Sequence, residues 1–273
     1  MTLPPDHRIK LTLHYDGAGF YGWQAQPGVR TVQAVLESAL ARLTGRPVRV
    51  VAAGRTDRGV HATGQVASAL VPAKWTPEAL RRALNAILPE DVWVAAAEPV
   101  PESFHARYDA IARSYTYRVG TSESARSPFR RRWCWPLARP LDFERLQAAA
   151  ALLLGEHSFR AFAKAGQPER GDRCTVIRAR WVPWRDHGFA FHITANRFLH
   201  HMVRYLVGTM VDVARGVRPH EELAALLQGE PSLETSPPAP AEGLFLTRVY
   251  YSADALRLEE DTDEDLPGLC GSG

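Results

Sequence analysis

The sequence predicts an α+β fold of two similar lobes, in which mainly antiparallel sheet is flanked by helices. Stretches with a period of two, typical of half-buried strands, alternate along the chain with stretches that carry one apolar helical stripe. Both halves show this mixture. The 273 residues, 45% of them hydrophobic, suffice for one large domain or two of ordinary size. This composition excludes a disordered chain or a fibre, and no apolar run reaches the length of a membrane span.

The first half is predicted to contain four strands and two helices. Thr31 and Thr76 are suited to begin the helices, because a threonine hydroxyl can accept a hydrogen bond from a free amide of the first turn. Gly45 ends the first helix. The expected order is strand 9–15, helix 32–43, strands 48–53 and 65–71, helix 77–87 and strand 92–97.

The second half repeats the alternation. Asp142 is suited to cap a helix, and Asp186-His187-Gly188 reads as the turn of a strand pair. The strongest apolar stripe of the chain lies in the segment 199–214. The expected order is strand 114–119, helix 143–154, strands 175–182 and 189–195, helix 199–214, loop 233–243 and strand 244–251.

The division that these patterns favour has two lobes between two tails. We expect an N-terminal tail at 1–7, an N-terminal lobe at 8–103, a C-terminal lobe at 104–255 and an acidic, disordered tail at 256–273. The acidic tail carries six acids and one base, so the rest of the chain has 32 basic and 24 acidic residues and a charge of about +8. Thirty of the 33 basic residues are arginines, which bind phosphate and stack on bases. The charge favours a polyanionic partner, although a coding bias toward arginine explains the ratio equally well.

The cysteines and the N-terminus favour a cytoplasmic protein. Cys134, Cys174 and Cys270 are widely spaced and odd in number, which fits neither a disulfide framework nor a zinc motif. The first ten residues show no apolar signal segment. We therefore expect a reducing cytosol and no membrane partner.

The segment 54–62 is the most unusual stretch of the chain. It places Asp57 between Arg55 and Arg58, in a turn bounded by glycines between two expected strands. Neighbouring arginines favour the ionised carboxylate, which suits a nucleophile or the partner of an ion pair. A structural ion pair is the commoner use of such a loop aspartate. The glycine spacing does not match that of a phosphate-binding loop.

Several other segments, taken in order along the chain, form a larger pattern together with this one. They are Tyr15-Asp16-Gly17 with Phe20-Tyr21-Gly22-Trp23-Gln24, Arg30-Thr31-Val32-Gln33, Phe104-His105-Ala106-Arg107 with Ala112-Arg113-Ser114-Tyr115-Thr116-Tyr117, Phe198-Leu199-His200-His201-Met202-Val203-Arg204, and Pro240-Ala241 with Gly243-Leu244-Phe245-Leu246. Together with Gly54-Arg55-Thr56-Asp57 they resemble the tRNA pseudouridine synthase A family over nearly the whole chain. The arginine at position 58 and the acidic tail depart from the family pattern.

The resemblance implies an isomerase that needs no cofactor and no metal. The family breaks the glycosidic bond of uridine, turns the base and rejoins it to the ribose through carbon, in a cleft between the two lobes. By this resemblance Asp57 is the catalytic nucleophile, which attacks either the ribose anomeric carbon or C6 of the ring. The target nucleotide has to leave its stack, so that the reacting atoms become accessible.

The resemblance also assigns four substrate-binding residues. Tyr115 would stack on the flipped base, and Arg55 would fill the gap that the base leaves. Arg204 would hold the Asp57 carboxylate, and Leu244 would line the uracil pocket. Each has a structural alternative: a core tyrosine, an ion pair with Asp57, a surface arginine and a buried strand leucine. His200 and His201, adjacent on the expected helix, point to different faces and make poor metal partners.

The substrate that the resemblance implies is the anticodon arm of tRNA, modified at positions 38, 39 and 40 by a homodimer. A synthase of the same fold with another RNA target remains an alternative. A non-catalytic RNA-binding module is a second one, which the retention of Asp57, Tyr115 and Arg204 argues against. A hydrolase of small nucleosides is a third, although the paired carboxylates or acidic metal cluster that it needs are not apparent.

Overall fold

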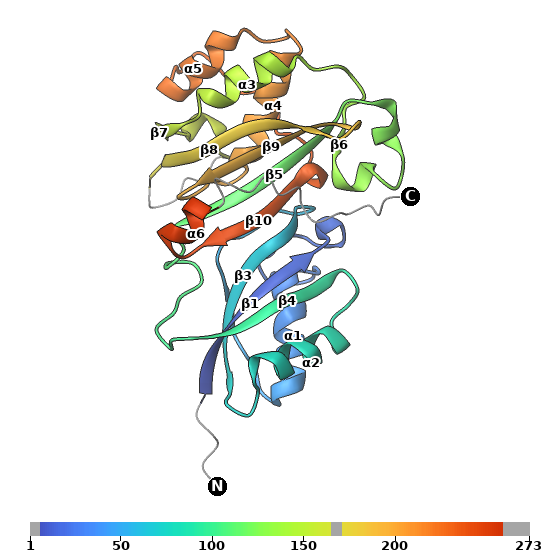
Figure 1. The fold of residues 1–273 in the computed structure, drawn as a ribbon, viewed down its shortest axis with the longest axis vertical. Coiled ribbons are helices and arrows are strands. Elements are labelled where there is room, and N and C mark those ends of the chain that lie inside the picture. The colour runs from blue at the N-terminus through green and yellow to red at the C-terminus, as the bar shows by residue number, and fades with distance from the viewer. Residues whose placement is uncertain (1–5, 165–170, 259–273) are drawn as a thin grey trace.

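A computed structural model describes residues 6–164 and 171–258. These residues form one ten-stranded sheet, in which the order along the main path is β4-β1-β3-β10-β5-β9-β8-β7, with β2 beside β3 and β6 beside β5 (Figure 1). The strands are β1 (Asp6–Tyr15), β2 (Val50–Ala52), β3 (His61–Pro72), β4 (Val92–Val100), β5 (Ala112–Gly120), β6 (Trp135–Pro136), β7 (Gly155–Ser158), β8 (Arg173–Trp184), β9 (Gly188–Ala195) and β10 (Leu244–Tyr250).

Six α-helices accompany the sheet in the described residues. They are α1 (Val32–Thr44), α2 (Pro77–Ile87), α3 (Phe143–Ala151), α4 (Met202–Ala214), α5 (His220–Gln228) and α6 (Ala253–Leu258). The side chains of Thr31, Thr76 and Asp142 each accept a hydrogen bond from an amide of the first turn, as predicted.

In the N-terminal half, β1 lies between β3 and β4 and pairs antiparallel with both. Its alternate residues, from Ile9 to Tyr15, are buried in one core cluster with the apolar stripes of α1 and α2. In the C-terminal half, β5 takes the same place between β9 and β10, again antiparallel. Of the thirteen residues of α4, ten are buried. The α4 helix therefore offers a rigid support to the residues at its N-terminal end.

The two halves meet where β10 pairs with β3. Phe245 and Leu246 of β10 lie parallel to His61 and Ala62 at the start of β3. Gly64 allows this approach, because a Cβ there would lie 1.9 Å from the carbonyl oxygen of Thr247. The sheet thus runs through both halves without a break, and the predicted α+β class with mainly antiparallel pairing is confirmed.

The structure corrects several details of the predicted elements. Helix α4 begins at Met202 and not at 199, and α3 ends at Ala151. The helix α5 was not predicted. Residues 256–258, which the sequence places in the acidic tail, belong to α6, and the rest of the predicted tail lies outside the described residues. None of the helices in the described ranges has the length and apolar character that a membrane span requires.

Candidate active site

The loop between β2 and β3 carries Asp57 and is fixed by contacts with the segment that follows β1. The hydroxyls of Thr56 and Tyr15 lie 2.8 Å apart, and the amide of Trp23 donates to the carbonyl of Thr56 over 3.0 Å. Gly22 has a φ of 88°, and a Cβ there would lie 2.6 Å from the Thr56 carbonyl oxygen. Because a larger residue would push the loop away, this glycine is part of what places Asp57.

Gln65 holds the start of the same loop from β3. Its side-chain amide donates to the carbonyl of Gly54 over 2.8 Å and to the Tyr15 hydroxyl over 3.3 Å. The amide of Val60 donates to the Asp57 carbonyl over 3.2 Å and closes the turn. The backbone on both sides of Asp57 is therefore anchored, while its carboxylate points away from the loop.

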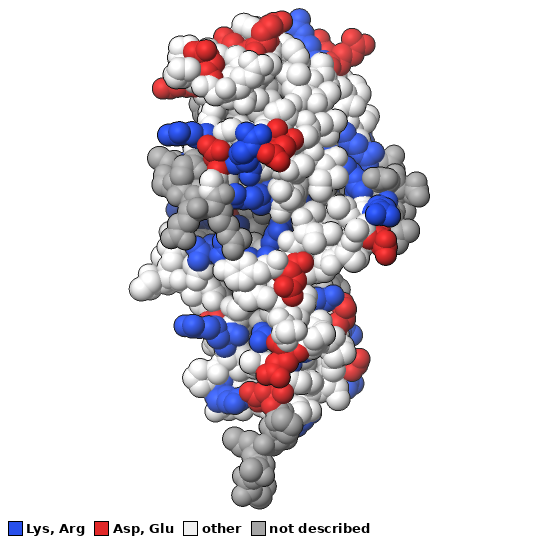
Figure 2. All heavy atoms as spheres, turned by 90° about the vertical axis from the view of Figure 1, so that its left-hand side faces the viewer, with Lys and Arg blue, Asp and Glu red and all other residues white. Residues whose placement is uncertain are grey.

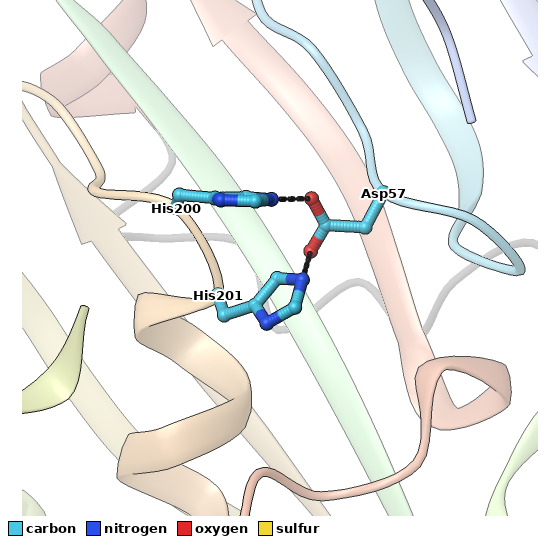
Figure 3. Close-up of side chains that lie close together, drawn as sticks. All are labelled: Asp57, His200 and His201. Carbon is cyan, nitrogen blue, oxygen red and sulfur yellow. Dashed lines mark ion pairs between the residues drawn. The ribbon is translucent and has the colours of Figure 1, made fainter. Parts of the chain in front are cut away.

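Two imidazoles face the Asp57 carboxylate from the C-terminal half (Figure 3). The Nε2 atom of His200 lies 3.2 Å from Oδ1, and the Nε2 atom of His201 lies 3.4 Å from Oδ2. Each contact pairs the carboxylate with a positive charge when the ring is protonated. Asp57 is 20% exposed, which leaves the carboxylate accessible beside these rings.

The convergence of His200 and His201 corrects the prediction that they point to different faces of a helix. Both precede α4, and His201 has a φ of 65° in the left-handed region. That region is uncommon for residues other than glycine and turns the chain sharply before the helix begins. The sequence carries no signal for this turn, so the contact of both rings with Asp57 was missed.

Burial lowers the pKa of His201, against the charge of Asp57, which raises it. Desolvation disfavours the imidazolium ion, so the neutral ring is favoured at this position. The ring is 18% exposed, whereas His200 is 56% exposed. The pair therefore combines one largely buried ring with one that is exposed and lies against it, with the ring centres 4.2 Å apart.

Arg204, in the first turn of α4, lies close to Asp57. Its Nη1 is 3.9 Å from Oδ2 of the carboxylate, and the side chain is 15% exposed. Its Nε donates to the carbonyl of Ala239 over 2.7 Å, and the Ala239 amide donates back to the Arg204 carbonyl over 2.9 Å. These two bonds hold the segment before β10 against α4.

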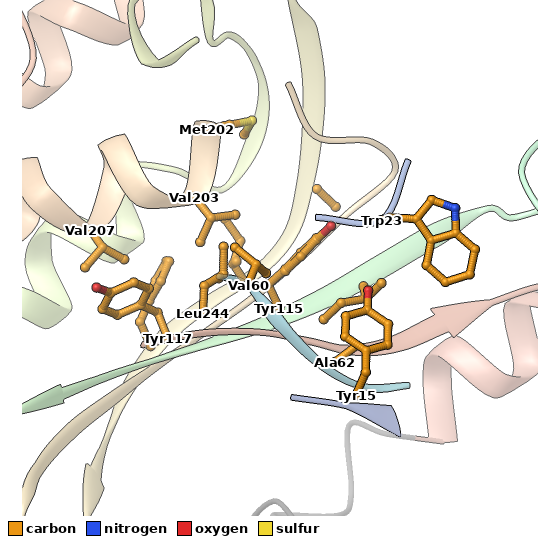
Figure 4. Packing of buried hydrophobic residues seen from close by; sticks show 14 of the residues in the cluster. Tyr15, Trp23, Val60, Ala62, Tyr115, Tyr117, Met202, Val203, Val207 and Leu244 are labelled. Carbon is orange, nitrogen blue, oxygen red and sulfur yellow. The ribbon is translucent and has the colours of Figure 1, made fainter. Parts of the chain in front are cut away.

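Tyr115 and Leu244 form the apolar floor beside this cluster (Figure 4). Tyr115 on β5 and Leu244 at the start of β10 are both buried, in one cluster with Val60 and Val203. The ring of Tyr115 meets Phe198 edge to face at 4.9 Å. Burial, with a smaller contribution from nearby Asp57, raises the pKa of Tyr115 well above its usual value. Its hydroxyl therefore stays protonated at neutral pH.

Arg55, predicted to fill the gap that the flipped base leaves, had an ion pair with Asp57 as its structural alternative. Its side chain is exposed. In the described ranges, the ion pairs of Asp57 are formed with His200, His201 and Arg204 rather than with Arg55. Arg55 is thus available to a partner at the surface.

A groove of about 470 Å³ opens near the candidate site. It is lined by Arg58 and Gly59, which follow Asp57 in the chain, by Ala18 and Arg204, and by the segment from Pro240 to Glu242. The guanidinium of Arg58 lies 4.2 Å from the ring centre of the exposed Tyr21. On the face shown in Figure 2, Lys and Arg side chains in the upper middle of the molecule lie among Asp and Glu side chains.

Arg113 is a positioning residue whose role the sequence did not reveal. Its guanidinium donates to four carbonyl oxygens, at distances between 2.8 and 3.1 Å, which belong to Ala53, Arg107, Ala110 and Asn196. Ala53 begins the Asp57 loop, and Asn196 begins the segment that leads to His200. One half-buried side chain therefore ties the two parts of the site together.

Comparisons with known proteins identify the family to which this chain belongs. A family model described as tRNA pseudouridine synthase matches residues 12–109 and 149–252. A curated protein of Maridesulfovibrio salexigens, named tRNA pseudouridine synthase A, is 39% identical over 97% of this chain and 97% of its own length. Proteins of the same name from Methylacidiphilum infernorum and Myxococcus xanthus are 41% and 42% identical, over 90% and 89% of this chain and 96% and 92% of their own lengths. The chain therefore belongs to the tRNA pseudouridine synthase family, which confirms the resemblance and the enzyme class, an isomerase, that the sequence predicted.

Proposed function

We propose that this protein converts uridine to pseudouridine at positions 38, 39 and 40 of the tRNA anticodon stem-loop, with Asp57 as the nucleophile. The observation that carries the proposal is the placement of Asp57. Its carboxylate stands on an anchored loop and lies within 4 Å of Arg204, a residue that lines the groove, in a chain of this family. The tRNA substrate is also in keeping with the names of the curated relatives.

The proposed chemistry is an isomerisation, in which substrate and product have the same composition although the hydrogen on C5 is exchanged for one at N1. An oxygen of Asp57 attacks either the anomeric carbon of the ribose or C6 of the ring, and the bond between N1 and the anomeric carbon breaks. The base turns, and a bond forms between C5 and the anomeric carbon, which in the anomeric route displaces the Asp57 oxygen from that carbon. The proton on C5 is then lost to solvent and N1 gains a proton, and in the C6 route the bond between Asp57 and C6 breaks, so that both routes restore the carboxylate. No cofactor or metal enters these steps.

The other predicted residues support this reaction from fixed positions. The flipped base would stack on Tyr115 over the apolar floor that Leu244 completes, because aromatic rings offer a face to any unstacked base. Arg204 balances the charge of Asp57 from the rigid α4. The exposed Arg55 would fill the space left in the RNA and bind the adjacent backbone.

We further propose that tRNA lies along the groove, bound mainly through its phosphates. Such binding weakens steeply as the salt concentration rises. The homodimer and the cytoplasmic location predicted from the sequence belong to the same proposal. So do the lobes at 8–103 and 104–255, between which the site would lie.

The test uses an unmodified tRNA transcript tritiated at uracil C5, because transfer of the glycosidic bond to C5 releases that tritium to water. The purified protein, without added cofactor, should release tritium, and sequencing of the product should map the change to positions 38 to 40. Release that maps elsewhere would contradict the proposed target. Bound tRNA without any release would contradict the reaction, and free uracil in the product would indicate a hydrolase.

A further inference from the structure

The contacts of Asp57 with two histidines have a chemical meaning that the proposed reaction does not use. Within the described ranges, Asp57, His200 and His201 form a group whose three ligand atoms all lie within 4.8 Å of one another. A carboxylate and two neutral imidazoles are a ligand set typical of protein sites for Zn²⁺ and similar ions.

The three ligand atoms lie close to the spacing that a small tetrahedral ion requires. An ion held at about 2.0–2.2 Å from each ligand atom requires ligand atoms about 3.3–3.6 Å apart. The Nε2 atoms of His200 and His201 lie 3.2 and 3.4 Å from different oxygens of Asp57, and one ligand atom from each residue lies within 4.8 Å of the other two, so small side-chain movements would bring all three into range. Both rings present Nε2 to the same carboxylate, so both can ligate through that atom (Figure 3).

The group can also close around an ion without rearrangement of the fold. Asp57 and His201 are 20% and 18% exposed and are held by the loop contacts and by the turn before α4. The His200 side chain is 56% exposed and can rotate, while its carbonyl is fixed by the amide of Lys164 over 3.1 Å. The positive charge of Arg204, 3.9 Å from Oδ2, opposes a cation, so we expect micromolar rather than tighter binding.

We propose that Asp57, His200 and His201 form an inhibitory site for a divalent transition-metal ion, Zn²⁺ in particular. The ion engages the carboxylate and occupies the space in front of it, so Asp57 can no longer attack the nucleotide. Mg²⁺ does not compete, because it prefers oxygen ligands and holds its water. The metal site stands on geometry alone, whereas the inhibition rests on the proposed function.

Metal binding is tested first, without RNA, on the full chain free of any purification tag. Zn²⁺ is titrated in competition with a fluorescent zinc indicator, for the wild-type protein and for His200→Ala, His201→Asn and His187→Ala. The last variant is the matched control, because His187 lies 2.8 Å from one carboxylate, that of Asp186, and belongs to no such group of three in the described ranges. Cys270→Ser is included because its thiol lies outside the described residues.

We expect one Zn²⁺ per wild-type chain and the same for His187→Ala and Cys270→Ser, with at least tenfold weaker binding for His200→Ala and His201→Asn. Circular dichroism shows whether each variant is folded, and Asp57→Asn, which keeps the shape but weakens the oxygen ligand, provides an independent third variant. Absence of stoichiometric binding to the wild-type protein, or equal affinity for all variants, would overturn the site.

The inhibition is tested next by tritium release in the presence of rising Zn²⁺. We expect release to fall over the concentration range in which the site fills, to recover on addition of a chelator, and to be unaffected by Mg²⁺ at the same concentration. Zinc that binds at this group without slowing release would overturn the inhibition. If the protein binds Zn²⁺ at this site but releases no tritium in zinc-free buffer, the proposed function is contradicted and the metal site stands.

Discussion

The two halves of the sheet place their strands in a similar order but differ in how one pair of neighbouring strands is connected. The strand β1 lies between β3 and β4, and β5 lies likewise between β9 and β10. In each half a helix precedes an antiparallel strand pair, β2–β3 or β8–β9. The pair β8–β9 closes in a tight turn at Asp186 and His187, whereas β2 and β3 are joined by the longer loop that carries Asp57.

This difference shows what turns a strand connection into a site. Asp186 is 83% exposed and contacts only its neighbour His187 among the ion pairs of the described residues. Asp57 is 20% exposed, because its loop folds against the segment after β1 and faces α4. A carboxylate at a turn is common, and what distinguishes Asp57 is that the other half of the molecule supplies its neighbours.

The helices of the two halves also differ, in how many of their residues are buried. Two residues of α2, Leu80 and Leu84, are buried, whereas ten residues of α4 are buried. The C-terminal half therefore supplies the rigid side of the site, and the N-terminal half supplies the reactive loop. The following predictions test how the halves are joined.

The largest effect on stability is expected at the junction of β3 and β10. In Gly64→Ala the new Cβ would meet the Thr247 carbonyl oxygen, which belongs to the backbone and cannot move away easily. We expect a loss of about 3 kcal/mol in the free energy of unfolding, measured by urea denaturation. Gly54→Ala is the control, because the nearest atom to its Cβ, the Tyr115 hydroxyl, is 4.0 Å away. Equal stability of both variants would show that the junction tolerates strain.

Arg113→Lys is expected to cost about 2 kcal/mol, since a lysine keeps the charge but cannot serve four carbonyl groups. Activity should fall further than stability, because the variant releases both the Asp57 loop and the segment before His200. Arg173→Lys, at an exposed ion pair with Glu156, is the control. Unfolding curves and tritium release measured on the same samples would separate the two effects, and full activity of Arg113→Lys would contradict the positioning role.

A smaller difference in stability is expected between two replacements of His201, the residue that forms the turn before α4. Asparagine tolerates the left-handed region and valine does not, so His201→Val should be less stable than His201→Asn by about 1 kcal/mol. Thermal unfolding of the two variants provides the comparison. A more stable valine variant would argue against the left-handed conformation of His201.

The smallest effect concerns Asp16, which contacts Arg132 across the two halves and His61 within its own half. Partial burial would raise the pKa of this carboxyl, but His61, the amide of Ala18 and the charge of Arg132 together lower it. The ionised form is therefore favoured in the folded protein. Its contribution is present above the ordinary value of 3.8 and is lost as the pH falls below it.

We therefore expect the stability difference between the wild-type protein and Asp16→Asn, below about 1 kcal/mol, to shrink between pH 5 and pH 3. Urea denaturation at several pH values measures it. A difference that grows as the pH falls would contradict the sign of the shift.

Local signals predicted most of the elements but not their long-range pairing. The caps Thr31, Thr76 and Asp142 were correct, because a cap depends on residues within one turn. Helix α5 was missed although Pro219 and Gly229 bound it, as its stripe is short. The insertion of β10 between β3 and β5 joins residues far apart in the chain, and no local pattern encodes it.

Among the candidate site residues, one pair that the sequence singled out lies together in the structure. The motif around Asp57 and the arginine on α4 led to two residues that the fold brings within 4 Å. The convergence of His200 and His201 depends on the φ of a single residue, and the four bonds of Arg113 depend on where distant loops end. Such contacts follow from tertiary structure, so the sequence could not reveal them.

The most direct test of Asp57 as the nucleophile compares it, in the loop between β2 and β3, with Asp186, in the turn between β8 and β9, in the same assay. Single-turnover tritium release is measured with Asp57→Asn and with Asp186→Asn, using excess protein over C5-tritiated tRNA, and tRNA binding is measured alongside. We predict a wild-type rate for Asp186→Asn and no release for Asp57→Asn, with tRNA binding retained by both. Release by Asp57→Asn at the wild-type rate would contradict the assignment of the nucleophile.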